Sequence, residues 1–148
     1  MSIVQPLLSG ARVLDLYAGS GALGLEALSR GAASADFVDV APAAIRVIRE
    51  NGTTLGALDQ MRIHRGEALR FAQKLEAATY DVAFADPPYN LGMAPRLAAA
   101  WLRVPFATVL GIEHDVHEEM PPGGEMRTYG GTAISIYRAS GGDQPAEG

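Results

Sequence analysis

The sequence predicts an α/β fold, in which a mostly parallel sheet with helices on both faces is closed by an antiparallel C-terminal hairpin. Three observations predict this fold. Up to residue 112, short apolar runs alternate with helix-forming segments, and such alternation specifies parallel strands joined by helices. A glycine-rich turn stands between the first run and the first helical segment. Near the C-terminus, two strand-like runs are separated only by Gly130-Gly131, which favours a tight hairpin.

The expected strands of the parallel part are short and rich in Val, Leu, Ile and Phe, as buried strands are. They are Arg12–Tyr17, Ala35–Val40, Met61–Arg65, Asp81–Ala85 and Ala107–Ile112. The helices expected between them are Ala22–Ser29, Pro42–Leu55, Ala68–Ala77 and Met93–Leu102. Pro42 suits a first helical position, and Gly31 and Gly56 suit helix ends. The strands of the hairpin are Glu125–Tyr129 and Thr132–Arg138.

Length and composition indicate one ordinary globular domain. With 48% apolar and 20% charged residues, the 148-residue chain can bury a core, which argues against a disordered protein. We expect one domain over residues 1–139 and a flexible tail over residues 140–148. The sequence shows no apolar run of about 18 residues, no secretory signal and no cysteine. We therefore expect a cytoplasmic monomer that does not enter a membrane.

The net charge of −5 by itself argues against a nucleic-acid partner, because phosphates are bound by Lys and Arg. The excess negative charge, however, is confined to the C-terminal part of the chain. From Glu113 onward, seven acidic residues stand against Arg127 and Arg138, whereas the preceding part is balanced. A basic group surrounds the third expected strand and consists of Arg62, Arg65, Arg70 and Lys74. We expect these four side chains to form a solvated face rather than to contact phosphates.

The glycine-rich turn predicts a cofactor site. Residues 19–24 follow an expected strand and open an expected helix, so the glycines let the backbone turn sharply and approach a ligand closely. Asp39 ends the next expected strand, where an acidic side chain can bind ribose hydroxyls. Together these features indicate a nucleoside-containing cofactor, and both NAD and S-adenosylmethionine fit them.

Asp15 favours S-adenosylmethionine over NAD. A carboxylate directly before the glycine turn would repel a pyrophosphate, but it would attract the ammonium group of a methionine moiety. Glu67, which follows the third expected strand, stands where it could accept a hydrogen bond from an adenine amino group. The alternatives are a helix N-cap for Asp15 and an acid in the first turn of a helix for Glu67.

The run Asp86-Pro87-Pro88-Tyr89 predicts a site for an exocyclic base amine. It follows the apolar run Val82–Ala85, and ligands bind at the carboxyl ends of strands in sheets of this kind. The lone pair of such an amine is delocalised into the ring, and a carboxylate and a backbone carbonyl that accept its two hydrogens localise it. Asp86 supplies the carboxylate, and Pro87 fixes the backbone and leaves its carbonyl free. Tyr89 offers a stacking face for an extruded base. The alternative is a strand-ending turn with a packed tyrosine.

Residues 13–31 closely resemble the cofactor motif of the RsmD-type small-subunit rRNA guanine-N2 methyltransferases. Asp86-Pro87-Pro88-Tyr89 is similar to the catalytic motif of that family, and residues 129–137 are similar to its closing hairpin. The resemblance covers most of the chain. The long first motif is specific, whereas Asp-Pro-Pro-Tyr is shared with many amino-methyltransferases that act on DNA, RNA and protein.

The resemblance implies a Rossmann-like class I methyltransferase fold, with a seven-stranded sheet whose seventh strand is reversed. It implies S-adenosylmethionine as the cofactor and one guanine of small-subunit ribosomal RNA, or of the small-subunit particle, as the target. The side chains expected at the guanine are Asp86, Pro87 and Tyr89, and no metal is expected. The residues expected at the cofactor are Asp15, Tyr17, Gly19, Gly21, Asp39, Glu67 and Ala68, although an aspartate is commoner than Glu67 in the family.

The chain departs from this family at its N-terminus. Members carry a longer region, with a basic hairpin and a helix, before the first strand, whereas Met1–Gly10 precedes Ala11 here. We expect a shortened chain, which bears on RNA binding. The alternatives left open are an amino-methyltransferase for another RNA or DNA base and a non-catalytic cofactor-binding remnant. An NAD-binding oxidoreductase is disfavoured by Asp15 and the Asp86 motif.

Two further groups of residues have competing interpretations. His114 and His117, beside Glu113 and Glu118, have a spacing that could hold a metal on a helix. Because the surroundings are acidic and Pro121 is near, we expect a solvated surface turn instead. Trp101 ends an expected helix behind three alanines, where we expect it to pack in the core.

Overall fold

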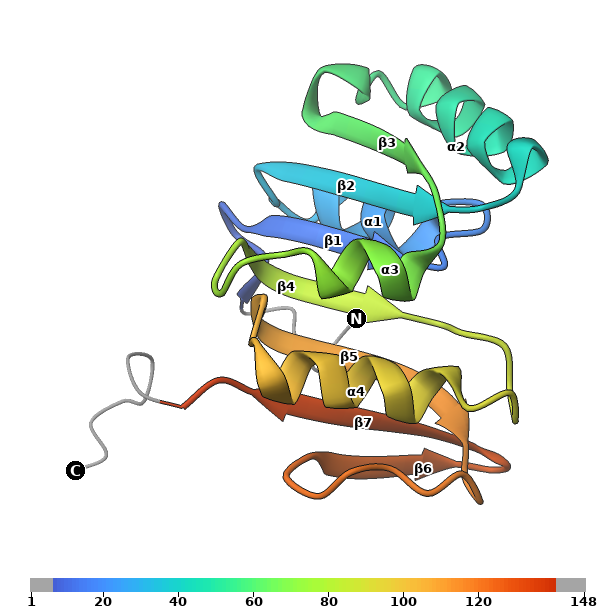
Figure 1. Cartoon of the computed structure of the whole chain (residues 1–148). Helices are drawn as coiled ribbons and strands as arrows, with labels where there is room; N and C mark the ends of the chain where they lie inside the picture. The colour runs from blue at the N-terminus through green and yellow to red at the C-terminus, as the bar shows by residue number, and fades with distance from the viewer. Residues whose placement is uncertain (1–6, 141–148) are drawn as a thin grey trace.

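The computed structural model describes residues 7–140, which form one seven-stranded sheet with the strand order β3-β2-β1-β4-β5-β7-β6 (Figure 1). The five parallel strands are β1 (Arg12–Leu16), β2 (Ser34–Asp39), β3 (Met61–Arg65), β4 (Tyr80–Ala85) and β5 (Ala107–Asp115). Strand β7 (Thr132–Arg138) is antiparallel to β5 and to β6 (Glu125–Tyr129). The predicted fold class is confirmed. Residues 141–148, most of the predicted tail, lie outside the described residues.

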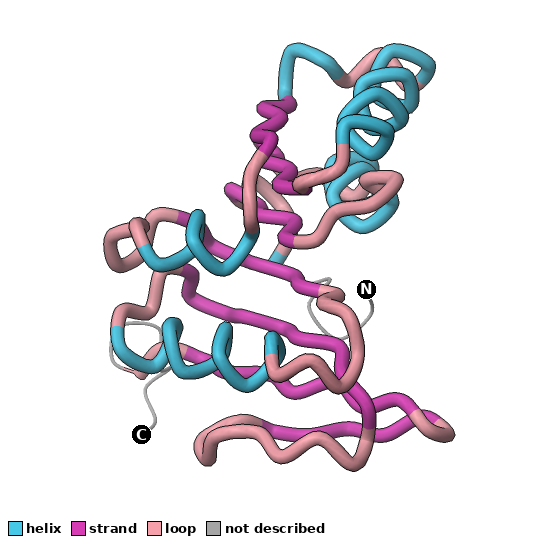
Figure 2. The backbone as a smooth tube through the Cα atoms, turned by 45° about the vertical axis from the view of Figure 1, so that its right-hand side comes forward, coloured by secondary structure: helices cyan, strands magenta, loops and turns pink. Residues whose placement is uncertain are grey.

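Two pairs of helices cover the two faces of the sheet (Figures 1 and 2). Helices α1 (Ala22–Ser29) and α2 (Pro42–Thr54) lie on one face, and α3 (Ala68–Gln73) and α4 (Met93–Arg103) lie on the other. A short 3-10 helix, η2 (Leu58–Gln60), precedes β3. Pro42 occupies the start of α2, as expected, because a first helical position needs no N–H group. No helix within residues 7–140 is both long and apolar enough to span a membrane.

Two element boundaries differ from the predicted ones by more than one residue. Helix α3 ends at Gln73 rather than at Ala77, since the N–H groups of Lys74 and Leu75 bond to carbonyls three residues back and Ala78 then takes a φ of 59°. Strand β5 continues three residues beyond Ile112 because it pairs with β7 over seven positions.

The longer β5 makes the predicted surface turn at His114 wrong. His114 is fully buried within the strand, where Nε2 lies 2.8 Å from Ser135 Oγ on β7 and Nδ1 lies 2.9 Å from the carbonyl oxygen of Asp115. Both ring nitrogens therefore have protein partners. Residues 7–140 contain no cluster of three His, Asp or Glu side chains that could hold a metal ion.

The core consists of one apolar cluster on each face of the sheet. The cluster beneath α3 and α4 includes Trp101, which is buried and donates from Nε1 to the carbonyl of Ala107 at 2.9 Å, so its predicted core position is confirmed. On the other face, Gly24 of α1 packs directly on the ring of Phe37. The basic residues of β3 and α3, namely Arg62, Arg65, Arg70 and Lys74, are exposed.

Candidate active site

The predicted site residues meet at the carboxyl edge of the parallel strands. Strand β1 lies between β2 and β4, so the chain order of the strands reverses at this point in the sheet. Ligands bind at such a switch point because the loops that leave neighbouring strands diverge to opposite faces and open a crevice between them. The loops that follow β1 and β4 carry the glycine turn and Asp86, and they leave the same edge of the sheet (Figure 1).

The glycine turn has the backbone conformation that its sequence predicts. Gly19 and Gly21 have φ angles of 59° and 82°, which glycine adopts without steric cost. Tyr17 also has a positive φ, 59°, although it carries a side chain. Asp39 holds the turn to the end of β2, because its Oδ2 accepts from the Gly19 N–H at 2.8 Å and its Oδ1 accepts from the Ala41 N–H at 3.0 Å.

Asp15 is an almost fully buried acid at the end of β1, with 2% of its surface exposed. Its Oδ2 accepts a hydrogen bond of 3.0 Å from the N–H of Gly24 in the first turn of α1, so it satisfies one of the free donors of that helix. Burial raises the pKa of Asp15 to about 7; the Gly24 hydrogen bond opposes this rise, and the charges of Asp86 and Asp39 add to it. The alternative of a helix-terminal acid is therefore observed for Asp15, which does not line the cavity at the ends of β1 to β3.

A small cavity of about 70 Å³ brings four of the predicted cofactor residues together. It is lined by Tyr17, Asp39, Val40, Gly66, Glu67 and Ala68. Glu67 caps α3, since its carboxylate accepts from the N–H groups of Arg70 at 2.9 Å and Leu69 at 3.2 Å. The alternative of a helix-terminal acid is thus observed for Glu67, at the N-cap itself.

The hydroxyl of Tyr17 is buried without a hydrogen-bond partner among residues 7–140. Burial raises the pKa of Tyr17 to about 12; the charge of Glu67 adds to the rise and that of Arg96 opposes it. A buried hydroxyl without a partner costs roughly 1–3 kcal/mol of stability. Tyr17 is thus a cavity-lining residue whose polar group has no partner among residues 7–140.

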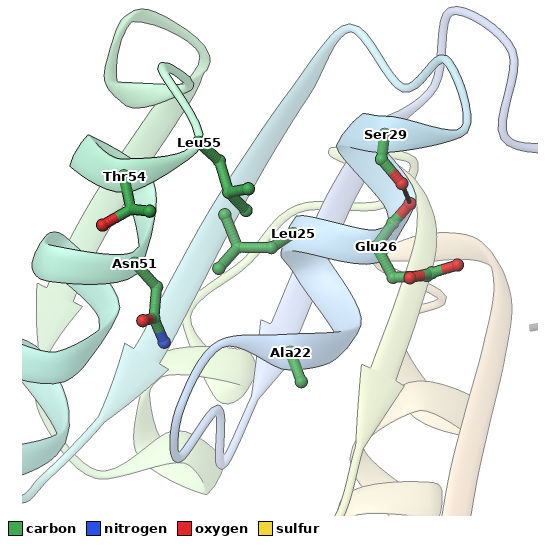
Figure 3. A pocket seen from close by; sticks show the side chains of 7 residues that line it. All are labelled: Ala22, Leu25, Glu26, Ser29, Asn51, Thr54 and Leu55. Carbon is green, nitrogen blue, oxygen red and sulfur yellow. Dashed lines mark hydrogen bonds between the residues drawn. The ribbon is translucent and has the colours of Figure 1, made fainter.

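A larger groove of about 430 Å³ lies between α1 and α2 (Figure 3). Its lining comes from the two helices and consists of Ala22, Leu25, Glu26, Ser29, Asn51, Thr54 and Leu55. None of the predicted site residues lines this groove. Chemistry depends on polar groups that converge on one point rather than on volume, so we assign the site to the smaller cavity and the adjoining edge of the sheet.

The loop that follows β4 is tied to the last strands of the sheet. The Tyr89 hydroxyl donates to Glu113 Oε2 at 3.3 Å and lies 3.0 Å from Thr132 Oγ1, and 39% of the Tyr89 surface stays exposed. Asn90 has a φ of 61° and donates from Nδ2 to Asp115 Oδ2 at 3.0 Å. These bonds leave the tyrosine accessible and restrict how far its loop can move.

Asp86 leads this loop, and its side chain is exposed, whereas Pro87 is buried. Partial desolvation raises the pKa of Asp86, and the charge of Glu113 raises it further. A carboxylate with a raised pKa holds a proton more readily than an ordinary aspartate, so Asp86 is suited to accept one.

The structure places three residues at this edge that the sequence did not identify as site residues: Glu113 on β5, Thr132 on β7 and Arg96 on α4. Only Glu113 carried a signal. It follows the apolar run Ala107–Ile112 directly, as Asp86 follows the run Val82–Ala85. Thr132 and Arg96 come to the site only through folding.

Comparison with known proteins adds to this geometry. The model of the family described as "Conserved hypothetical protein 95" matches residues 1–138. The chain is 34% identical over 152 residues to "Putative rRNA methyltransferase YlbH" of Bacillus subtilis, covering 95% of this chain and 82% of that protein. It is 40% identical over 91 residues to "Ribosomal RNA small subunit methyltransferase D" of Escherichia coli, covering 61% of this chain and 44% of that protein. The aligned part thus spans less than half of the Escherichia coli protein.

Solved structures share the fold. A "Putative methyltransferase yhhF" from Escherichia coli superposes with a TM-score of 0.80 at 27% identity, covering 93% of this chain and 80% of that one. An RNA methyltransferase from Salinibacter ruber, solved in complex with S-adenosyl-L-homocysteine, superposes with a TM-score of 0.72 at 12% identity, covering 95% and 90%. At 12% identity the likeness concerns the fold.

Proposed function

Because the chain belongs to the family described as Conserved hypothetical protein 95, the RsmD-type family that its motifs resemble, we propose that it is an S-adenosylmethionine-dependent methyltransferase. Its proposed target is the exocyclic N2 amine of a guanine in small-subunit ribosomal RNA.

The observation that carries the cofactor assignment is the sign of the charge beside the glycine turn. Asp15, Asp39 and Asp86 lie close enough that the latter two raise the pKa of the first. An anionic pyrophosphate placed against this group would be repelled, whereas a cationic ligand is attracted. S-adenosylmethionine carries a sulfonium and an ammonium, so the group favours it over a dinucleotide.

The residues of the cavity fit the rest of that ligand. Asp39 stands where its carboxylate can bind ribose hydroxyls, although each of its oxygens already accepts one hydrogen bond, from the N–H group of Gly19 or of Ala41. Gly19 has open space where a side chain would project, so a ligand can approach the backbone there. The unpartnered Tyr17 hydroxyl and Glu67 lie beside the same cavity. Asp15 is the proposed partner of the ammonium group.

Asp86 and Pro87 supply the chemistry at the target amine. When bound, S-adenosylmethionine supplies an electrophilic methyl group. Asp86 and the carbonyl of Pro87 accept the two hydrogens of the amine, so the nitrogen lone pair is directed away from the ring. The raised pKa of Asp86 lets its carboxylate take up the proton that the methylated nitrogen releases. Tyr89 stacks on the extruded base.

Ribosomal RNA as the substrate is supported by the Bacillus subtilis and Escherichia coli relatives, both of which bear the names of rRNA methyltransferases. A guanine-N2 target is supported by the resemblance of residues 13–31 and 86–89 to the guanine-N2 family. A protein with this substrate works where ribosomal subunits are assembled, which is the cytoplasm in a bacterium.

Mass spectrometry of rRNA nucleosides tests the proposal. In a strain that lacks the gene we expect the loss of one N2-methylguanosine from small-subunit rRNA, and its return when this protein is supplied. Loss of a methylated adenosine or cytidine instead would contradict the guanine target. Unchanged rRNA would contradict the rRNA substrate.

The Asp86→Ala variant tests the assigned mechanism. We expect turnover to be abolished while the affinity for S-adenosylhomocysteine stays within a few-fold, because Asp86 lies beyond the cofactor cavity. Calorimetry and a methyl-transfer assay measure the two properties. Loss of cofactor binding in a folded variant would contradict the role assigned to Asp86.

A further inference from the structure

Glu113 stands beside Asp86 at the edge of the sheet. Strands β4 and β5 pair in parallel, and the last paired positions are Ala85 with Ile112. Glu113 follows Ile112 within β5, and Asp86 follows Ala85 directly after the end of β4, so the two residues occupy neighbouring positions at the same edge of the sheet. Neighbouring strands are about 4.8 Å apart, so the backbones of the two residues are close. Partial desolvation raises the pKa of Asp86, and the charge of Glu113 raises it further.

The bond from Tyr89 leaves part of Glu113 available. The tyrosine hydroxyl donates to Oε2 of Glu113, and Glu113 itself is half-buried. Oε1 has no hydrogen bond to any of the described side chains around the loop, so it can accept from a ligand stacked on Tyr89. The aromatic face, Asp86 and Glu113 thus belong to one site.

Two adjacent carboxylates select a base by the pattern of donors on its edge. A carboxylate is an acceptor only, and it needs a donor opposite each of its oxygens. In guanine the N2 amine is next to the N1–H group, so two neighbouring donors face the site. In adenine and cytosine the ring nitrogen next to the amine is a bare acceptor, whose lone pair would meet the second carboxylate. An unmade bond of this kind costs roughly 1–3 kcal/mol, or more when the group is charged.

We propose that Glu113 is the specificity-determining residue of this site, which accepts the N1–H of the target guanine while Asp86 and Pro87 accept the hydrogens of its N2 amine. The inference rests on the proposed function, whose target amine it takes as given. It adds the reason why the chain rejects adenine and cytosine, whose amines Asp86 and Pro87 alone would accept equally well.

The test uses small-subunit rRNA in which the target guanosine is replaced by 2-aminopurine riboside. This base keeps the 2-amino group but has a bare acceptor at N1. We expect the wild-type protein to prefer guanine by at least about 100-fold in kcat/KM, because sites that bind a substrate N–H discriminate strongly against analogues without it. In Glu113→Gln the amide can donate to N1, and we expect the preference to fall about tenfold or more.

The matched control is Thr132→Val. It removes Thr132 Oγ1, the second partner of the Tyr89 hydroxyl, and keeps Glu113. If Glu113 only anchors Tyr89, both variants lower the rates on guanine and 2-aminopurine alike, and an unchanged preference in Glu113→Gln overturns the inference. A wild-type protein that methylates guanine without discriminating against 2-aminopurine also overturns it. A wild-type protein that methylates neither RNA overturns the proposed function, and the inference with it.

Discussion

Replacing Asp15 by Asn should stabilise the protein and weaken cofactor binding. Asp15 is 2% exposed, and burial raises its pKa from an ordinary value of 3.8 to about 7. An acid with a raised pKa in the folded state keeps its proton there while the unfolded chain has already lost it. Stability is therefore lost as the pH rises from about 4 to about 7. Asn is neutral and close in shape, so it avoids this loss.

The magnitude follows from the two pKa values. At about 1.4 kcal/mol for each pH unit, the ionised Asp15 costs about 4 kcal/mol at pH 8. We expect Asp15→Asn to raise the free energy of unfolding by up to about that amount at pH 8 and by less than half of it at pH 5. Asp59→Asn, at an exposed acid of η2, controls for the loss of one negative charge.

Urea unfolding at the two pH values measures the stability, and calorimetry with S-adenosylhomocysteine measures the cofactor affinity. We expect the variant to lose about tenfold in affinity at pH 8, which corresponds to the loss of one charge-assisted contact of about 1.4 kcal/mol. The wild-type affinity should also rise between pH 6 and pH 8, as Asp15 loses its proton. Equal stability of variant and wild type at pH 8 would refute the claim that the buried, ionised Asp15 destabilises the fold. Equal affinity would refute the contact with the ammonium group.

Three further perturbations have expected outcomes. Gly24→Ala should destabilise the fold by about 1–3 kcal/mol in urea unfolding, because a Cβ there would overlap the ring of Phe37; an unchanged midpoint would mean that α1 can shift at no cost. Tyr17→Phe removes a hydroxyl that has no partner among residues 7–140. We therefore expect the free energy of unfolding of the ligand-free protein to rise by about 1 kcal/mol and the affinity for S-adenosylhomocysteine to fall. A less stable variant would contradict this account. Asp81→Asn should have the opposite pH dependence to Asp15→Asn. The hydrogen bonds and the charge of Arg12 lower the pKa of Asp81, so the stability that this pair contributes is present at neutral pH and lost on acidification, and thermal melts at pH 7 and pH 3 should differ most for the wild type.

The sequence by itself determined the class of the fold and most of its elements. Strand–helix alternation and the two-glycine hairpin are local patterns, and the sheet forms from the expected strands. The glycine turn was equally readable, because positive φ angles at Gly19 and Gly21 are a property of single residues. Asp39 and Asp86 were identified because they stand at the ends of apolar runs, and Asp15 because it interrupts the first run just before the glycine turn; the ends of parallel strands meet at one edge of the sheet.

Only the tertiary structure decided what surrounds those residues. The prediction of a surface turn at His114 was wrong because its burial depends on the pairing of β5 with β7, whose Ser135, 21 residues away along the chain, contacts the His114 ring. Glu113 gained its place beside Asp86 from the register of β4 and β5, which no local pattern specifies. The pKa of Asp15 likewise depends on the helix packed over it and on acids from two other strands. Burial and charge act through space. The acids could therefore be identified from the sequence, whereas their pKa values depend on the tertiary structure.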